Sequence, residues 1–287
     1  MRRLRHAAVP YLLMLPGGLW LVIFFVVPVV ALISLSTQQG DIVDGFTQTF
    51  HFANYANAWH NYQPQFLRSL LYGGLATILC AALGYPVAYW IAFRGGARKS
   101  VYLFLLLLPF FVSFVLRTVS WQYFLSDNGI LLGPLKSWGL LPENFRILAT
   151  GTAVIGGLTY NYLPFMVLPI YVALERIDFR LVEAAQDLYA SRVSAFRRVV
   201  FPLSLPGVFG GVLLTFVPVV ADYVNASILG GTSNTMIGNI IQDEFLQVQD
   251  YPTGSALSFM LMALLLIGMF SYARALGTEN VLEVAAA

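Results

Sequence analysis

The chain has 287 residues, of which 58% are hydrophobic and only 10% are charged, and its formal net charge is +2. A soluble domain of ordinary composition carries about 25% charged residues, so this chain has too few to cover a surface that faces water. We therefore expect a protein that uses the bilayer as its solvent and does not bind nucleic acid. Cys80 is the only cysteine, which excludes an intrachain disulfide, and the three histidines are dispersed, so no metal site is expected.

Six apolar stretches are long enough to cross a bilayer, which takes about 20 residues of helix. In chain order they cover roughly residues 11–35, 67–93, 101–124, 147–173, 205–229 and 255–276. The first follows three arginines, as in a signal peptide, but it is too long for one and no clear cleavage site ends it, so we interpret it as a retained helix. No long stretch alternates polar and apolar residues, which is against a β-barrel. The sequence predicts an all-α, polytopic fold with one transmembrane domain over residues 1–287.

The distribution of positive charge predicts the orientation of these spans, because cytoplasmic segments carry an excess of Lys and Arg. With the N-terminus inside, the exceptions to the rule are Arg68, Arg117, Lys136 and Arg146, and the other twelve of the sixteen Lys and Arg residues lie in cytoplasmic segments. We therefore expect a multi-pass protein of the bacterial inner membrane with both termini in the cytoplasm. The longest cytoplasmic loop is then residues 174–204, between spans four and five.

This loop carries the pattern of two short amphipathic helices. Asp178 is placed to cap a helix that begins near Phe179, in which Leu181, Ala184, Ala185 and Leu188 share one face at helical spacing. Ser191 is placed to cap a second helix, through Val193, Phe196 and Val200, which we expect to end before Pro202. From periodicity alone, the two helices could equally lie on the headgroups with their arginines facing anionic lipid.

The loop resembles the EAA motif of permease subunits of ABC importers, in which E-A-A is followed after three residues by Gly and, nine residues later, by I-x-L-P. Glu183, Ala184, Ala185 and Pro202 match, and apolar residues stand at the other two positions. Tyr189 occupies the glycine position. A glycine there suits a left-handed bend or a close backbone approach, in which tyrosine would be strained.

The resemblance extends over nearly the whole chain, through stretches such as LLPFFVSFVLRTVSWQYFLSDNGIL and TFVPVVADYVNASILGG, to the permeases of spermidine/putrescine importers, and most to their B/H type. It implies several partners, namely a cytoplasmic ATPase dimer that holds ATP and Mg, a second permease subunit and an extracytoplasmic substrate-binding protein. It also implies a set of residues that couple to the ATPase: Glu183, Ala184, Ala185, Leu188, Tyr189, Arg192 and Pro202. The chain itself has no P-loop pattern, and we expect it to bind no cofactor.

Ionisable residues inside predicted spans are the candidates for the substrate pathway, because charge in the hydrocarbon usually faces a cavity or the bundle interior. Asp222 lies in the fifth span beside Tyr223, and Arg117 lies toward the outer end of the third. Asp222 would attract a cationic substrate, and aromatic residues such as Trp121, Tyr160, Tyr162 and Tyr223 would offer their ring faces to an ammonium. The alternatives are that Asp222 and Arg117 pair with each other or with the backbone, and that the aromatic residues serve packing.

The importer permease is the function that these features favour, for polyamines or for another small solute. A polytopic membrane enzyme would need paired polar residues at one depth, and Asp222 has no acidic partner in another span. An ion-coupled carrier usually shows internal repeats, and none is seen. Two predicted outer segments stay open. Residues 54–62 are expected to form an amphipathic helix on the outer membrane surface, either as an aromatic interface anchor or as a contact for the binding protein. The acidic segment 230–254 is interpreted as a contact for the binding protein, a means of gathering cations near the entrance, or a solvated loop.

Overall fold

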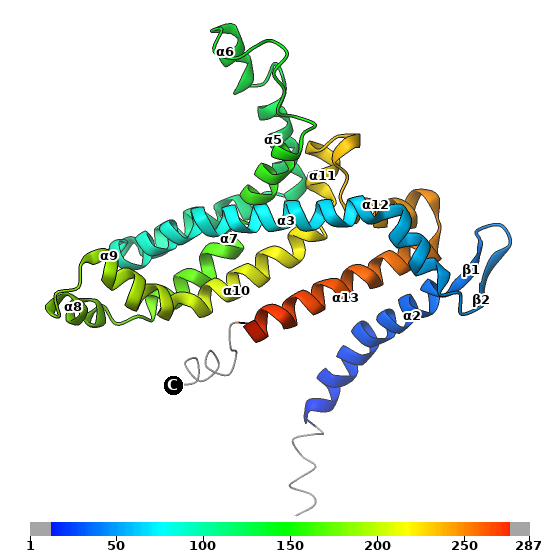
Figure 1. The fold of residues 1–287 in the computed structure, drawn as a ribbon, viewed down its shortest axis with the longest axis horizontal. Coiled ribbons are helices and arrows are strands. Elements are labelled where there is room, and N and C mark those ends of the chain that lie inside the picture. The colour runs from blue at the N-terminus through cyan, green and yellow to red at the C-terminus, as the bar shows by residue number, and fades with distance from the viewer. Residues whose placement is uncertain (1–12, 276–287) are drawn as a thin grey trace, which may run out of the picture. The chain divides into compact units, whose positions relative to one another are not determined.

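The computed structural model describes residues 13–275, which are helical except for one small hairpin and the connecting segments (Figure 1). Within this part of the chain the contacts define two compact units. Unit 1 holds residues 13–63 and 240–264, and unit 2 holds residues 64–239 and 265–275. Arg2, Arg3 and Arg5, on which the predicted orientation partly depends, lie outside the described residues.

Unit 1 begins with an apolar helix over Leu13–Ser36, which includes the π-helical turn η1 (Val22–Val26) and α2 (Val27–Ser36). Two four-residue strands follow, β1 (Gln38–Asp41) and β2 (Gly45–Gln48), which pair antiparallel with Gln38 opposite Gln48. The Asp41 carboxylate closes their turn by accepting hydrogen bonds from the backbone N–H groups of Val43 and Asp44 at 2.8 Å each. The sequence analysis did not anticipate this hairpin, because strands of four mostly polar residues leave no periodic signal.

The remaining elements run in chain order through both units. They are α3 (Ala53–Arg94), η2 (Gly96–Arg98), α4 (Lys99–Leu107), η3 (Leu108–Phe111), α5 (Phe114–Leu125), α6 (Leu132–Ser137), α7 (Gly151–Glu175), α8 (Arg180–Asp187), α9 (Arg192–Ala195), η4 (Phe196–Val200), α10 (Phe201–Val220), α11 (Val224–Leu229), η5 (Thr232–Asn234), α12 (Ile237–Asp243), η6 (Glu244–Val248) and α13 (Tyr251–Ala275).

Five of the described helices are long and apolar enough to cross a membrane, and a bent pair of helices supplies a sixth candidate. This confirms the polytopic helical fold, although several predicted bounds change. Residues 54–62 are helical as predicted, but they form the first part of α3, a continuous helix of 42 residues, and their place on the membrane surface stays a prediction. The predicted fourth and sixth spans correspond to α7 and α13, which run over Gly151–Glu175 and Tyr251–Ala275.

The predicted third span is not one straight helix. The segments Gly96–Phe111 and Phe114–Leu125 meet at 88°. The α-helix ends where Pro109 enters the 3-10 turn η3, and Val112 then takes an extended conformation at φ −94° and ψ 140°. A proline cannot continue the α-helical hydrogen bonding, and the extended residue after the turn changes the chain direction.

The predicted fifth span differs at both ends. Its helix continues without interruption from Arg192 to Val220, so the prediction that a separate helix ends before Pro202 is wrong. Just before the proline, η4 widens into a π-helical turn in which the Phe201 N–H bonds the Phe196 carbonyl. Such a turn relieves the clash between a proline ring and the preceding carbonyls. At the other end, residues 221–223 separate α10 from α11, so Asp222 lies in a break rather than within a helix.

The core of unit 2 is formed where α10 packs closely against α7. Gly207 makes this approach possible, because a Cβ there would lie 2.6 Å from the Pro169 carbonyl oxygen and 2.5 Å from the Ala173 Cβ. Small residues serve this purpose in membrane helices, where backbones must come together to gain packing. The residue types of the interface, more than its hydrophobicity, therefore set how these two helices pack.

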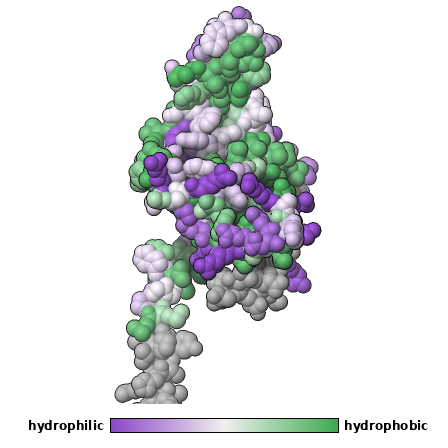
Figure 2. All heavy atoms as spheres, turned by 90° about the vertical axis from the view of Figure 1, so that its left-hand side faces the viewer, coloured by the Kyte–Doolittle hydropathy of each residue, from purple (hydrophilic) through white to green (hydrophobic). Residues whose placement is uncertain are grey.

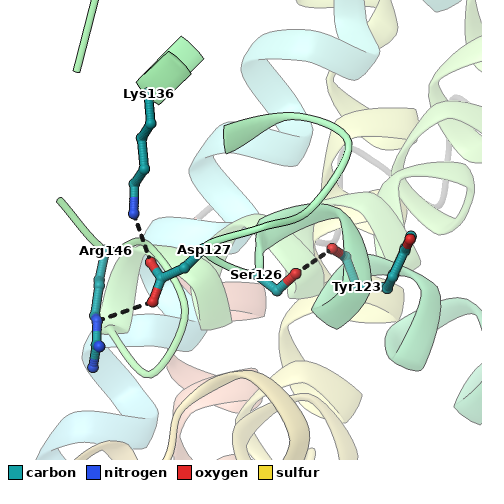
Figure 3. Close-up of polar contacts among 5 residues, drawn as sticks. All are labelled: Tyr123, Ser126, Asp127, Lys136 and Arg146. Atoms are coloured by element: carbon teal, nitrogen blue, oxygen red, sulfur yellow. Dashed lines mark hydrogen bonds and ion pairs between the residues drawn. The ribbon is translucent and has the colours of Figure 1, made fainter. Parts of the chain in front are cut away.

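The connection between α5 and α7 is held by ion pairs around Asp127 (Figure 3). Its carboxylate lies 2.9 Å from Lys136 Nζ and 3.0 Å from Arg146 Nε. The hydrogen bond from Lys136 is the main cause that lowers the pKa of Asp127 below its ordinary value, and the Arg146 charge adds to it. Two of the four Lys and Arg residues predicted to lie outside the cytoplasm thus have a local acidic partner.

Candidate functional site

The predicted coupling loop folds as two short helices, α8 and α9, joined by a bend at Leu188–Ala190. The Asp178 carboxylate accepts a hydrogen bond from the Arg180 N–H at 2.9 Å, and the Ser191 hydroxyl accepts one from the Ser194 N–H at 3.2 Å. The Ser191 cap is therefore confirmed, whereas α8 has Phe179 at its N-cap position and Asp178 supports the turn just before it. Figure 2 shows hydrophilic side chains gathered on the face of the molecule that carries α8 and α9.

Tyr189 makes the bend in the left-handed conformation, at φ 61°. The Ala190 N–H bonds the Ala185 carbonyl at 3.0 Å, and the Tyr189 N–H bonds the Gln186 carbonyl at 2.9 Å. These two bonds define a Schellman motif, whose left-handed position is usually glycine. The bend that a glycine would make is thus present here, and a tyrosine occupies it.

Three of the four residues predicted to form the apolar face of α8, all except Ala185, point away from the protein. Leu188 is 83% exposed and Tyr189 is 100% exposed, and Leu181 and Ala184 are exposed as well. Val182 packs inward and joins the core cluster formed by the ends of α3 and α7, and the half-buried Ala185 packs against the same cluster. Exposed apolar side chains at the end of a fixed loop are typical of an interaction surface.

The charged and polar members of the predicted coupling set, Glu183 and Arg192, are exposed, and Pro202 lies in the first turn of α10. Within residues 13–275, neither the Glu183 carboxylate nor the Arg192 guanidinium has a hydrogen bond or ion pair with another residue. Both charges are therefore available to a partner.

The second candidate region is a buried polar network around Asp222, between α5, α7 and the break before α11. Asp222 is 5% exposed, and its carboxylate accepts hydrogen bonds from Tyr162 Oη at 3.0 Å, from the Asn225 N–H at 2.8 Å and from Asn225 Nδ2 at 3.2 Å. Asn161 Nδ2 donates in turn to Asn225 Oδ1 at 3.0 Å and to Thr118 Oγ1 at 3.2 Å. A buried carboxylate needs such donors, because burial without them is strongly unfavourable.

Arg117 lies near this network but makes no ion pair with Asp222 among the described residues. It is 8% exposed, and its guanidinium lies over two aromatic rings, 4.8 Å from the centroid of Phe110 and 5.6 Å from that of Phe114. Its Nε has no hydrogen-bond partner in the described part of the chain. The alternative in which the two charges pair with each other is therefore not what this structure contains.

A cavity of about 490 Å³ opens beside Arg117 at the break between η3 and α5. Its lining comes from the break itself and from one face of α7, with Phe110, Phe114, Arg117, Asn161, Tyr162 and Phe165 among its residues. Asp222 is not part of this lining. Its carboxylate accepts hydrogen bonds from Tyr162 and Asn225 instead. An aromatic cavity thus lies at the 88° break, between η3, α5 and α7.

The other aromatic candidates do not line this cavity. Trp121 and Tyr160 pack edge to face with centroids 5.3 Å apart. Tyr223 is exposed, and its carbonyl accepts a hydrogen bond from Asn239 Nδ2 at 2.8 Å. The roles assigned to these three residues stay predictions.

The amides in the network, Asn161 and Asn225, and the Thr118 hydroxyl were not among the residues predicted for the site. The predicted residues inside the spans were all charged or aromatic. An uncharged amide in an otherwise apolar helix also has to find a partner, so Asn161 and Asn225 carried a usable signal in the printed sequence.

In unit 1, Glu244 is the acidic residue of the segment 230–254 that is buried. Its carboxylate accepts a hydrogen bond from Tyr62 Oη at 2.5 Å. Burial raises the pKa of Glu244 above its ordinary value, and the charges of Asp250 and Asp243 raise it further, while the Tyr62 hydrogen bond opposes them. Glu244 therefore has a structural partner in the fold, and Asp243 and Asp250 remain as candidates for a contact with another protein.

These features, apolar spanning helices with an exposed loop between two of them, define a polytopic helical membrane protein. Residues 84–275 match the family described as binding-protein-dependent transport system inner membrane component. The chain belongs to this family, and it is therefore a multi-pass transport permease rather than an enzyme.

Two relatives cover almost the whole chain. The spermidine/putrescine transport system permease protein PotB of Haemophilus influenzae is 39% identical over 259 residues, which are 89% of this chain and 90% of that one. The protein of the same name from Escherichia coli is 36% identical over 268 residues, 92% of this chain and 98% of that one. Both are named as transport permeases, which confirms the class predicted from the sequence.

Among solved structures, a chain of a bacterial ABC transporter that imports the acidic polysaccharide alginate has the same fold. Its TM-score is 0.75 at 18% identity, over 96% of this chain and 97% of that one. A second structure of an alginate transporter, in complex with a pentasaccharide-bound periplasmic protein, gives a TM-score of 0.69 at 19% identity over 95% of each chain. At this identity the likeness concerns the fold alone.

Proposed function

We propose that this chain is one of two permease subunits of an ABC importer for polyamines, spermidine or putrescine, and that it forms half of the translocation pathway. The observation that carries the proposal is the similarity to the spermidine/putrescine permeases, at 36–39% identity over about nine tenths of the chain. A binding protein outside the cytoplasm delivers the substrate. ATP and Mg are bound by a separate ATPase dimer in the cytoplasm.

The coupling to that ATPase is assigned to α8, α9 and the bend between them. Leu188 and Tyr189 project from the loop, and Glu183 and Arg192 offer opposite charges close to them. Val182 and Ala195 hold the loop against the ends of the spanning helices. This arrangement suits a surface that docks into a cleft and transmits its movement to the spans.

The orientation that accompanies this function places the α8–α9 loop and both termini in the cytoplasm. Single cysteines introduced at Gly40, Ser137 and Gly231 should then react with an impermeant thiol reagent added outside, whereas those at Gly95 and Ser194 should not. A reversed pattern at any two positions would contradict the assignment.

A second candidate substrate is another small solute carried by the same type of importer. An Escherichia coli protein named as inner membrane ABC transporter permease YdcU is 29% identical over 231 residues, 75% of this chain and 72% of that one. The test is uptake of labelled spermidine and putrescine in a strain that lacks this gene, with and without the gene restored. Equal uptake in both strains, with the rest of the importer present, would contradict the polyamine assignment.

A further inference from the structure

Four aromatic rings and one cation form a closed circuit around the cavity at the break before α5. Phe110 contacts Phe165 with centroids 5.2 Å apart, Phe165 contacts Tyr162 at 6.0 Å, and Tyr162 contacts Phe114 at 6.0 Å. The Arg117 guanidinium lies over Phe110 and Phe114 and so connects the two ends of this series. We call these five residues the aromatic box.

Arg117 is held in the box by ring faces alone. Within residues 13–275 its Nε has no hydrogen-bond acceptor and its guanidinium has no carboxylate partner, although the residue is only 8% exposed. A buried cation without a counter-ion is unfavourable. The faces of aromatic rings attract cations, and they repel anions for the same reason, so the box is built for a positive charge.

The polar network adds a hydrogen-bond acceptor to the wall of the same cavity. The Asp222 carboxylate can only accept, so Asn225 must turn its Nδ2 toward it and its Oδ1 toward Asn161. Asn161 must then donate through Nδ2, which leaves its Oδ1 without a partner among the described residues. Asn161 lines the cavity, and its unpaired Oδ1 can accept a hydrogen bond from a donor such as an ammonium.

We propose that the aromatic box is a binding site for a primary alkylammonium group, and that Arg117 is a tethered cation that occupies it when no substrate is present. The proposal rests on the proposed function, because a polyamine supplies such groups. An arriving ammonium displaces the guanidinium from the ring faces and donates a hydrogen bond to Asn161 Oδ1. When it leaves, Arg117 returns, so the box is never empty and the substrate never binds tightly, which suits release during transport.

The test is binding of labelled butylammonium to the purified complex of both permeases and the ATPase, without the binding protein. The Arg117→Met variant lacks the competing guanidinium, so it should bind butylammonium about 5- to 30-fold more tightly, which is the range of one desolvated cation–π contact. Uncharged butanol should bind equally to both proteins. In uptake assays the same variant should show a lower KM together with a lower maximal rate, because the bound substrate leaves more slowly.

Val119→Ala is the matched control, because Val119 is an exposed residue of the same helix outside the box. It should bind butylammonium like the unmodified complex. If Arg117→Met does not assemble, Arg117→Lys keeps the charge but stacks less well on rings, so its butylammonium binding should still be tighter than that of the unmodified complex.

Unchanged or weaker butylammonium binding in the assembled variant would overturn the proposal. That result is the one expected if Arg117 instead pairs with an anion or with a carboxylate of the second permease. The outcome does not depend on which solute is carried, because butylammonium binding tests the box and spermidine uptake by the unmodified complex tests the proposed function.

Discussion

Tyr189 offers the sharpest test of the coupling loop, because its backbone and its side chain make separable contributions. A non-glycine residue in the left-handed region costs about 1–2 kcal/mol, and Tyr189 is at φ 61° with its side chain 100% exposed. No contact within the described chain offsets this strain. We therefore expect the ring to be an anchor in the ATPase cleft, where a buried aromatic residue contributes about 2 kcal/mol or more.

Three substitutions separate the strain from the ring. Tyr189→Phe keeps both and should preserve coupling. Tyr189→Ala keeps the strain and removes the ring, and Tyr189→Gly removes both. The Schellman bonds are made by the backbone, so all three variants should keep the bend.

The assay is ATP hydrolysis by the purified importer in proteoliposomes, with and without substrate-loaded binding protein. A loss of about 2 kcal/mol in docking corresponds to about 30-fold weaker association. Tyr189→Ala and Tyr189→Gly should therefore lose most of the substrate-stimulated rate, and glycine should recover a small part by relieving the strain. Stimulation at or above the unmodified level in Tyr189→Gly, with the complex fully assembled, would refute the anchor and leave the bend as the only requirement.

The remaining predictions concern the loop charge, the buried carboxylate and the helix interface. Glu183→Arg should abolish substrate-stimulated ATP hydrolysis while the chain still inserts in the membrane, and normal stimulation would count against a contact with the ATPase. Asp222→Asn replaces an acceptor by a donor facing Asn225, so the amount of assembled complex should fall by the equivalent of about 1–3 kcal/mol; unchanged abundance with severalfold lower uptake would instead favour a direct role in the pathway. Gly207→Val should reduce assembly through a clash with Pro169, whereas Gly210→Val, where a Cβ meets only the Pro169 Cβ at 3.7 Å, should be tolerated.

The parts of the fold that follow from composition and local signals were predictable from the sequence. Apolar length gives the spans, and the Asp178 and Ser191 hydrogen bonds depend on residues two or three positions away. The break before α5 and the continuity across Pro202 were not predictable in this way. A proline can end, kink or be absorbed by a helix, and neighbouring packing decides which of these occurs.

The candidate site was also only partly predictable from the sequence. The left-handed bend at Tyr189 was predictable because the motif has a glycine at this position. The structure shows that the bend is kept with tyrosine in place of that glycine. The aromatic box was not predictable, because it depends on rings from both arms of the 88° turn and from α7, which comes later in the chain. Single residues such as Arg117 and Tyr162 could be named from the sequence, but their grouping needed tertiary geometry.

The helix from Arg192 to Val220 makes the fifth span one continuous element of 29 residues, although it contains the π-helical turn η4 and the internal prolines Pro206 and Pro218. At about 1.5 Å per residue it is about 43 Å long, with the docking bend at one end and Asp222 just beyond the other. No loop interrupts this helix, so the docking bend and the residues around Asp222 are joined by one continuous backbone. Inserting one alanine in its middle would rotate one end by about 100° relative to the other, and should impair both the close packing of Gly207 against α7 and the coupling of ATP hydrolysis to uptake.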